Sequence, residues 1–197
     1  MQDRDDILLS IVVPAYNEGR RIQATLGTAR AALAELRLTR YEIIVADDAS
    51  TDDTALLAAE EMARVVISGK RNIGATRNVG GAAARGRYLL FLDADTQLSA
   101  DALAAMLQAL ERGAVGGGAR LCWSEPTSWP AKLILALWNG CSQLLHTPAG
   151  SFFFVRSDVF RKVGGFNEGY YIAEELVLAR QLKRVGRLVI LRTPIAT

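Results

Sequence analysis

Two aspartates one residue apart, Asp93 and Asp95, are the residues whose types and spacing most directly indicate chemistry. They follow Tyr88 to Leu92, a short apolar run of the kind that forms a strand buried on both faces. Two carboxylates at the end of such a strand repel each other unless a cation lies between them and an anionic ligand. The alternative is a plain turn, since Ser99 can cap a helix over Ala100 to Arg112. A cap explains Ser99 but leaves both aspartates unexplained.

Similar polar clusters follow the first two apolar runs of the chain. The segment Tyr16 to Glu18 comes after the first run, and Asp47 with Asp48 comes after the second. If these strands are parallel neighbours, their carboxyl ends meet at one edge of the sheet, where open α/β sheets bind their ligands. Each cluster alone could be a helix cap. Three clusters at equivalent strand ends favour a ligand site.

The elements that would position these side chains alternate between short apolar strands and helical patterns. This alternation predicts an α/β fold with a mostly parallel central sheet flanked by helices. The expected strands are Leu8–Val13, Tyr41–Ala46, Arg64–Ile67, Tyr88–Leu92, Gly116–Leu121, Gly150–Val155 and Leu188–Leu191. The expected helices are Arg21–Leu36, Thr54–Ala63, Ala75–Ala84, Ala100–Arg112, Ser128–Leu145 and Tyr170–Gly186, the last with Leu178, Leu182 and Val185 facing inward.

Composition narrows the functional class. A length of 197 residues, half of them apolar, suits one domain with a sizeable core. A net charge of +2 with scattered basic residues argues against a nucleic-acid partner. The polar, acidic N-terminus is no secretory signal, and no apolar run reaches the length of a membrane span. Cys122 and Cys141 lack metal-ligand spacing, so we expect buried thiols in a reducing, cytoplasmic compartment.

The segment Ser128 to Leu145 is apolar nearly all round and carries Trp129 and Trp138. Pro130 suits the first turn of a helix. The favoured interpretation is a helix in the protein core. The alternative is a helix lying on a membrane surface, where tryptophan is favoured. That alternative would place the protein at the inner face of a membrane as a peripheral protein.

An ordered set of motifs connects these observations. The motifs are VPAYNE, VADDASTDDT, KRNIGATRNVG, FLDADTQLS, GSFFFVRSDVFRKVGGFNE and EELVLARQLKRVG. The set resembles the family-2 glycosyltransferases with a GT-A fold, and it covers Ile11 to about Gly186. The resemblance implies one domain over residues 1–197, with a Rossmann-like nucleotide-sugar-binding half (about 8–98) and an acceptor-binding half (about 99–197). It further implies a nucleotide-sugar donor, a Mn²⁺ or Mg²⁺ ion, and inversion at the anomeric carbon.

On the donor side, the resemblance assigns residues to the nucleotide base. Tyr16 would stack on the base, and the carboxylate of Asp47 would accept a hydrogen bond from the ring N–H. Asp48 would share that role, orient the turn, or act only as a helix-capping acid. Pro14 belongs to the same donor-binding motif as Tyr16.

Basic and acidic residues near the diphosphate form a second group. The guanidinium of Arg77 would contact the base or a phosphate, and its alternative is a solvated charge on a helix. Glu18 would reach the nucleotide or simply favour the first turn of the following helix. Lys70 and Arg71 are looser candidates for steering the diphosphate.

The resemblance gives the two aspartates of the central motif separate tasks. Asp93 would contact the ribose and contribute to the metal site, and Ala94 lies between the two acids in the donor site. Asp95 would bind Mn²⁺ or Mg²⁺ directly, since hard cations prefer oxygen ligands. The metal would stabilise the negative charge that accumulates on the departing diphosphate.

The attacking acceptor hydroxyl also needs a base. The family usually supplies the aspartate of a Glu-Asp pair at a helix start, and here the pair is Glu174 and Glu175. Glu175 can accept a proton if its pKa and reach suit, although its side chain is one methylene longer. The alternative is that both glutamates only favour the helix N-terminus.

The sequence therefore predicts a metal-dependent inverting glycosyltransferase that moves a sugar from a UDP- or GDP-sugar to a glycan or a lipid carrier. A nucleotidyltransferase is an alternative, but it normally carries an early glycine-rich loop, and AYNEGRR has one glycine. A non-catalytic or truncated nucleotide-sugar-binding module is another alternative. Glu175 in place of an aspartate, and a chain ending at Thr197 without a closing basic or aromatic segment, make this module conceivable.

Overall fold

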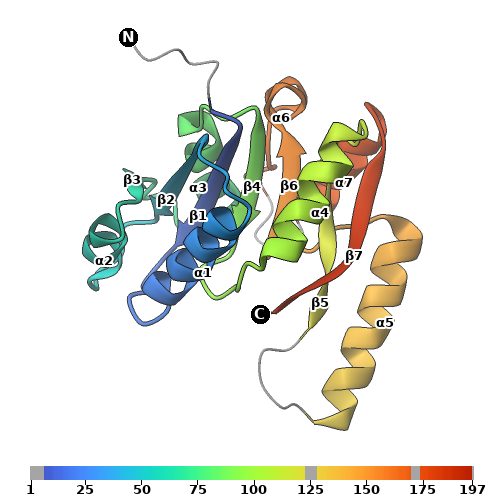
Figure 1. Ribbon diagram of the computed structural model, residues 1–197, viewed down its shortest axis with the longest axis horizontal. Coiled ribbons are helices and arrows are strands. Elements are labelled where there is room, and N and C mark those ends of the chain that lie inside the picture. Colours follow the sequence, from blue (N-terminus) through green and yellow to red (C-terminus); the bar gives the residue numbers. More distant parts are fainter. Residues whose placement is uncertain (1–6, 123–127, 170–173, 197) are drawn as a thin grey trace.

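The computed structural model contains a seven-stranded sheet with helices on both faces (Figure 1). It describes residues 7–122, 128–169 and 174–196. The strands lie in the order β3-β2-β1-β4-β6-β5-β7. Their bounds are β1 (Leu9–Ala15), β2 (Tyr41–Asp47), β3 (Arg64–Ile67), β4 (Tyr88–Leu92), β5 (Gly116–Cys122), β6 (Phe152–Arg156) and β7 (Leu188–Ala196).

The pairing of β1 decides where the functional residues meet. β1 pairs in parallel with β2 on one side and with β4 on the other. β6 is antiparallel to β4 and β5, whereas β5 and β7 pair in parallel. The mostly parallel sheet predicted from the sequence is thus confirmed. Since β1, β2 and β4 run the same way, the three polar clusters that follow them lie at one edge of the sheet.

Two hydrophobic cores hold the helices against the sheet. Helices α1 (Ile22–Glu35), α2 (Thr54–Glu60) and α4 (Ala100–Glu111) pack on one face, and α1 and α4 stand in front of the strands in Figure 1. Helices α3 (Ile73–Ala83), α6 (Ser157–Val163) and α7 (Glu174–Lys183) belong to the other face. Side chains of β1 alternate between the cores, with Ile11 and Val13 in the first and Val12 in the second.

Helix α5 (Trp129–Leu145) corrects the favoured sequence interpretation, because it is not a core helix. It lies beside β5 and extends past the sheet (Figure 1). Two of its buried side chains are polar, Asn139 and Ser142. The amide of Asn139 accepts from the backbone N–H of Leu121 and donates to its carbonyl, both at 2.9 Å. Its outward side carries exposed apolar side chains at Trp129, Leu133, Ile134, Leu137, Leu144 and Leu145. The bonds of Asn139 connect this helix to β5.

Three smaller expectations also change. Val185 does not face inward but is 38% exposed, because α7 ends at Lys183 and Val185 lies in the following turn. Cys122 is half-buried rather than buried, and the side chain of Cys141 lies outside the described residues. The last strand continues to Ala196 through Pro194, which an edge strand tolerates because one side needs no ladder bonds. None of the described helices is long and apolar enough to cross a bilayer.

Candidate active site

A cavity of about 510 Å³ opens at the shared carboxyl ends of β1, β2 and β4. Its size is typical of pockets that hold small-molecule ligands. Many of the predicted site residues meet in its wall, namely Pro14, Tyr16, Glu18, Asp48, Asp93, Ala94 and Asp95. The rest of the wall comes from Ala15 and from Arg71, Asn72, Ile73 and Thr76, at and before the start of α3.

Asp47 and Asp48 have different surroundings. Asp48 lies in the cavity wall, and its Oδ1 accepts a hydrogen bond from the backbone N–H of Arg71 at 2.9 Å. Asp47 is buried outside that wall. Its carboxylate accepts from the Ser50 hydroxyl at 2.5 Å and from the Ser50 backbone N–H at 3.2 Å. Asp47 therefore holds the turn that follows β2, and Asp48 is the acid beside the cavity.

An arginine covers the aromatic ring of the wall. Tyr16 is 44% exposed, and the guanidinium carbon of Arg71 lies 4.2 Å from the centre of its ring. This distance allows a cation–π interaction. Arg71 was only a loose candidate for steering the diphosphate, and no sequence pattern indicated its stacking on Tyr16. Lys70, the other loose candidate, is exposed and lies outside the cavity wall.

The turn carrying the paired aspartates is fixed by backbone bonds. The backbone N–H of Asp93 donates to the Ser151 carbonyl at 3.1 Å, and its carbonyl accepts from the N–H of Thr96 at 3.0 Å. The Thr25 hydroxyl of α1 donates to the carbonyl of Ala94 at 2.6 Å. These contacts hold a turn in which Asp93 is half-buried and Asp95 is exposed. No sequence signal marked Thr25 for this task.

Arg77 of α3 is buried, so the interpretation as a solvated helix charge is wrong. Its Nη2 donates to Asp93 Oδ1 at 2.7 Å and to the Gly150 carbonyl at 3.2 Å. Its Nη1 donates to Glu174 Oε1 at 2.5 Å. Arg77 lies outside the cavity wall and joins an acid of the β4 turn to the start of α7.

Glu174 and Glu175 begin α7 but differ in environment. Glu174 is buried against Arg77, whereas Glu175 is half-buried. Burial raises the pKa of Glu175 above the ordinary 4.5, and the charges of Glu174 and Asp93 raise it further, although Arg77 and a backbone hydrogen bond oppose them. A carboxylate with a raised pKa is suited to accept a proton near neutral pH.

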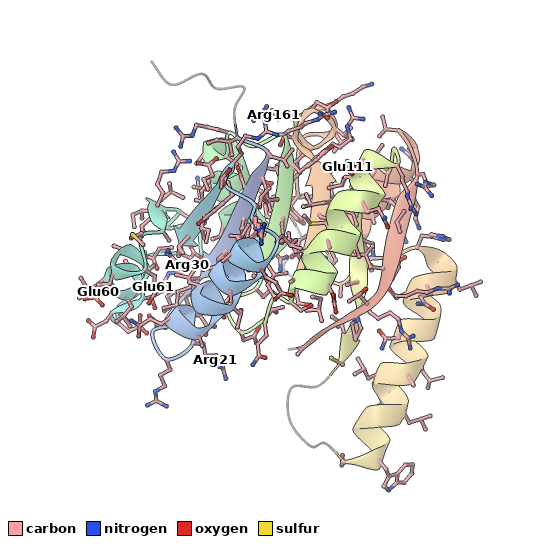
Figure 2. All side chains as sticks on the ribbon, in the orientation of Figure 1. Arg21, Arg30, Glu60, Glu61, Glu111 and Arg161 are labelled. Atoms are coloured by element: carbon pink, nitrogen blue, oxygen red, sulfur yellow. The ribbon has the colours of Figure 1, made fainter. Side chains whose placement is uncertain are left out.

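Glu18 adds a further acid to the wall. Burial raises its pKa and the nearby charge of Asp95 raises it too, while Arg21 lowers it. Arg21, labelled beside the start of α1 in Figure 2, lies 3.6 Å from a carboxylate oxygen of Glu18. The cavity wall thus combines a partly exposed aromatic ring, one face of which Arg71 covers, with several carboxylates.

Residues 10–164 match the glycosyl transferase family 2. This match covers most of the chain, including β1, β2, β4 and the three polar clusters. The chain belongs to glycosyltransferase family 2. The family resemblance inferred from the sequence motifs is confirmed.

Individual relatives of this family-2 protein agree with that assignment. Over 105 residues the chain is 37% identical to the dolichyl-phosphate beta-glucosyltransferase of Saccharomyces cerevisiae, a match that covers 48% of this chain and 31% of that protein. The chain spans about a third of the length of such curated relatives.

Solved structures share the fold. S. aureus TarS 1-349 matches with a TM-score of 0.78 at 22% identity, covering 97% of this chain and 60% of that one. Glucosyl-3-phosphoglycerate synthase from Mycobacterium tuberculosis, in complex with Mn²⁺, uridine-diphosphate and glucosyl-3-phosphoglycerate, matches with a TM-score of 0.70 at 21% identity, covering 96% and 71%. The predicted GT-A fold is confirmed.

The cavity wall carries two carboxylates, Asp93 and Asp95, of the kind that hard divalent cations prefer. Within residues 7–122, 128–169 and 174–196, no group of three His, Cys, Asp or Glu side chains could hold a metal alone. Asp95, however, is exposed in the wall, and no lysine or arginine of the described residues pairs with it. Mg²⁺ is commonly bound by one or two carboxylates together with substrate phosphates. Asp95 and Asp93 fit that pattern.

Proposed function

We propose that this chain transfers a sugar from a UDP- or GDP-sugar to a hydroxyl acceptor, with inversion and with the help of Mn²⁺ or Mg²⁺. The observation that carries the proposal is the cavity in which Tyr16, Asp48 and Asp95 meet. It combines a ring on which a base can stack, an acid that can accept from a base N–H, and a carboxylate that can hold a cation. Membership of the family supports the same activity.

The proposed chemistry is a direct displacement. The acceptor oxygen bonds to the anomeric carbon while the bond from that carbon to the diphosphate breaks on the opposite face, so configuration inverts. Glu175 takes the proton of the acceptor hydroxyl onto its carboxylate, for which its raised pKa is suited. A cation held by Asp95 and Asp93 would supply electrostatic stabilisation for the leaving diphosphate. Tyr16 and Asp48 would orient the nucleotide.

Calorimetric titration of UDP and of GDP into the wild-type chain, each with and without Mn²⁺, tests the donor site. We expect one nucleotide to bind, and only when the metal is present, because the diphosphate must complete the metal's coordination. The nucleotide that binds identifies the donor class. Absence of binding by both nucleotides in all conditions would refute the proposal.

Product analysis separates the alternatives. A glycosyltransferase releases nucleoside diphosphate from the sugar donor when an acceptor is present. A nucleotidyltransferase would release pyrophosphate from a nucleoside triphosphate instead. A non-catalytic module would bind the donor without turnover, whatever glycan or lipid-linked acceptor is added.

For the acceptor side, we propose peripheral contact with the inner face of a membrane through the outward side of α5, which brings the enzyme near a lipid-linked acceptor. Helix α5 presents several exposed apolar side chains and no acidic residue, and Trp129 at its start is 77% exposed. Arg180 and Lys183 of α7 line a groove beside Leu145 at the other end of the helix. An apolar face with tryptophan and flanking cations is typical of interfacial helices. A dolichyl-phosphate enzyme among the relatives is consistent with such an acceptor.

Leu137→Glu should weaken binding to vesicles of phosphatidylcholine and phosphatidylglycerol by roughly tenfold or more in a sedimentation assay, since a buried leucine contributes about 1.5–3 kcal/mol. Leu56→Glu on α2 is the matched control, because Leu137 and Leu56 are 61% and 59% exposed. Equal losses in both variants, or no binding by the wild type, would contradict the membrane contact.

A further inference from the structure

We infer that Arg77 is a positioning residue that fixes the metal-side acid Asp93 relative to the start of α7, where the proposed base Glu175 lies. The inference rests on the proposed function of the site and deepens it. The sequence favoured direct contact between Arg77 and the nucleotide. The structure instead encloses its guanidinium between two protein carboxylates, outside the wall of the donor cavity.

The two partners of Arg77 come from different parts of the chain. Asp93 is 16 residues and Glu174 is 97 residues from Arg77 in sequence. Asp93 lies in the turn after β4, next to Ala94 and Asp95, and Glu174 is the first residue of α7. One guanidinium thus joins the donor side of the site to its acceptor side. The planar fork of arginine can donate to both acids, which the single ammonium of lysine cannot do with the same geometry.

The surroundings hold the guanidinium in this orientation. Its carbon lies 5.5 Å from the centre of the Phe166 ring. A Cβ atom at Gly150 would lie 2.9 Å from Arg77 Nη2, and a Cβ at Gly74 would lie 3.2 Å from Glu174 Cγ. Because glycine has no Cβ, Gly150 and Gly74 leave room for the side chains of Arg77 and Glu174, respectively.

The unpaired nitrogen of Arg77 supports the same conclusion. Among the described residues, its buried Nε has no hydrogen-bond partner. The guanidinium is therefore oriented by its bonds to the two carboxylates and to the Gly150 carbonyl, although this orientation leaves Nε without a partner.

The bridge has a mechanical consequence for Glu175. Glu174 cannot move without breaking its bond to Arg77, and Glu175 follows it directly at the start of the same helix. The bond from Arg77 to Asp93 ties this helix start to the turn that carries Asp95. Base and metal-binding acid are thereby held at a fixed separation, which direct displacement requires.

Arg77→Lys and Arg77→Met test the role. We expect kcat to fall about 100-fold, the cost of a misplacement of roughly 1 Å, with little change in the KM for the donor. Hydrogen–deuterium exchange should increase in the first turn of α7, whether or not substrate is present. Glu174→Gln should lower kcat in the same direction, and the effects of Arg77→Met and Glu174→Gln should be non-additive because the residues share one contact.

Arg30→Met is the matched control. The Nε of Arg30 in α1 lies 3.6 Å from a carboxylate oxygen of Glu61, and both residues are labelled in Figure 2. Like the Nε of Arg77, it is buried without a hydrogen-bond partner among the described residues, but Arg30 does not line the cavity. Arg30→Met should change neither kcat nor hydrogen–deuterium exchange in α7. A raised donor KM with unchanged kcat in Arg77→Lys would overturn the inference and make Arg77 a donor-binding residue. Unchanged exchange in α7 would also overturn it. A wild type without turnover would refute the proposed function instead, since the exchange measurement does not depend on activity.

Discussion

Asp95→Ala is expected to abolish the metal-dependent part of nucleotide binding. Asp95 is exposed in the cavity wall beside Asp93, so its replacement removes the carboxylate that we propose as a metal ligand while leaving the fold intact. Losing several kcal/mol of metal-mediated attraction corresponds to more than about 100-fold in affinity. Calorimetric titration of the preferred nucleoside diphosphate, with and without Mn²⁺, measures this effect directly.

Asp101→Ala is a suitable control for the metal prediction. Asp101 is also an exposed aspartate, in the first turn of α4, and it does not line the cavity. The Asp101→Ala variant should bind nucleotide and metal as tightly as the wild type does. If Asp95→Ala kept the metal-dependent gain in affinity, Asp95 would not be the metal ligand.

Glu175→Gln is expected to reduce turnover by about 10²–10⁴-fold, the usual contribution of a general base. Glutamine keeps the shape of the side chain but cannot take up a proton, so donor affinity should stay near that of the wild type. Steady-state kinetics and calorimetry together measure the two quantities. Glu111→Gln, at the end of α4 in Figure 2, changes an exposed glutamate outside the site and should have no effect. Equal turnover in Glu175→Gln and the wild type would refute this base.

The pH dependence follows from the same residue. Only the deprotonated form of Glu175 can act as the base, and burial raises its pKa above 4.5. Activity should therefore fall as the pH drops through this raised pKa, at a higher pH than an ordinary glutamate would give. The acidic limb of the kcat/KM profile reports that pKa, and Glu175→Gln should remove the limb.

The sequence by itself determined the sheet, the family and the edge at which the site lies. A short, continuous apolar run such as Tyr88 to Leu92 is buried on both sides only as a strand in a helix-covered sheet. Local composition is therefore sufficient to predict such strands. The polar clusters after β1, β2 and β4 follow from the same pattern, because parallel strands end at a common edge. The residue types at Asp93 and Asp95 then predicted a cation site without any knowledge of tertiary contacts.

The tertiary structure decided which of two adjacent residues lines the cavity. Asp47 and Asp48 are chemically identical, and the sequence favoured Asp47 for the base. Asp47 is the last residue of β2, and its carboxylate accepts from Ser50 in the following turn. Asp48 lies just beyond the strand, in the cavity wall, where its carboxylate accepts from the backbone N–H of Arg71.

Contacts between residues distant in sequence decided the burial of Arg77 and the orientation of α5. The sequence predicted that Arg77 contacts the nucleotide or is a solvated helix charge, and it could not show the ion pairs with Asp93 and Glu174, because these partners are distant in sequence. The apolar content of α5 likewise did not show which side of the helix faces the sheet. Asn139 bonds to the backbone N–H and carbonyl of Leu121, which lies beyond the residues of β5 that pair with β6, whereas Leu133, Ile134 and Leu137 are exposed. Sequence patterns describe each element, but burial of a charge or exposure of a leucine depends on what the fold places beside it.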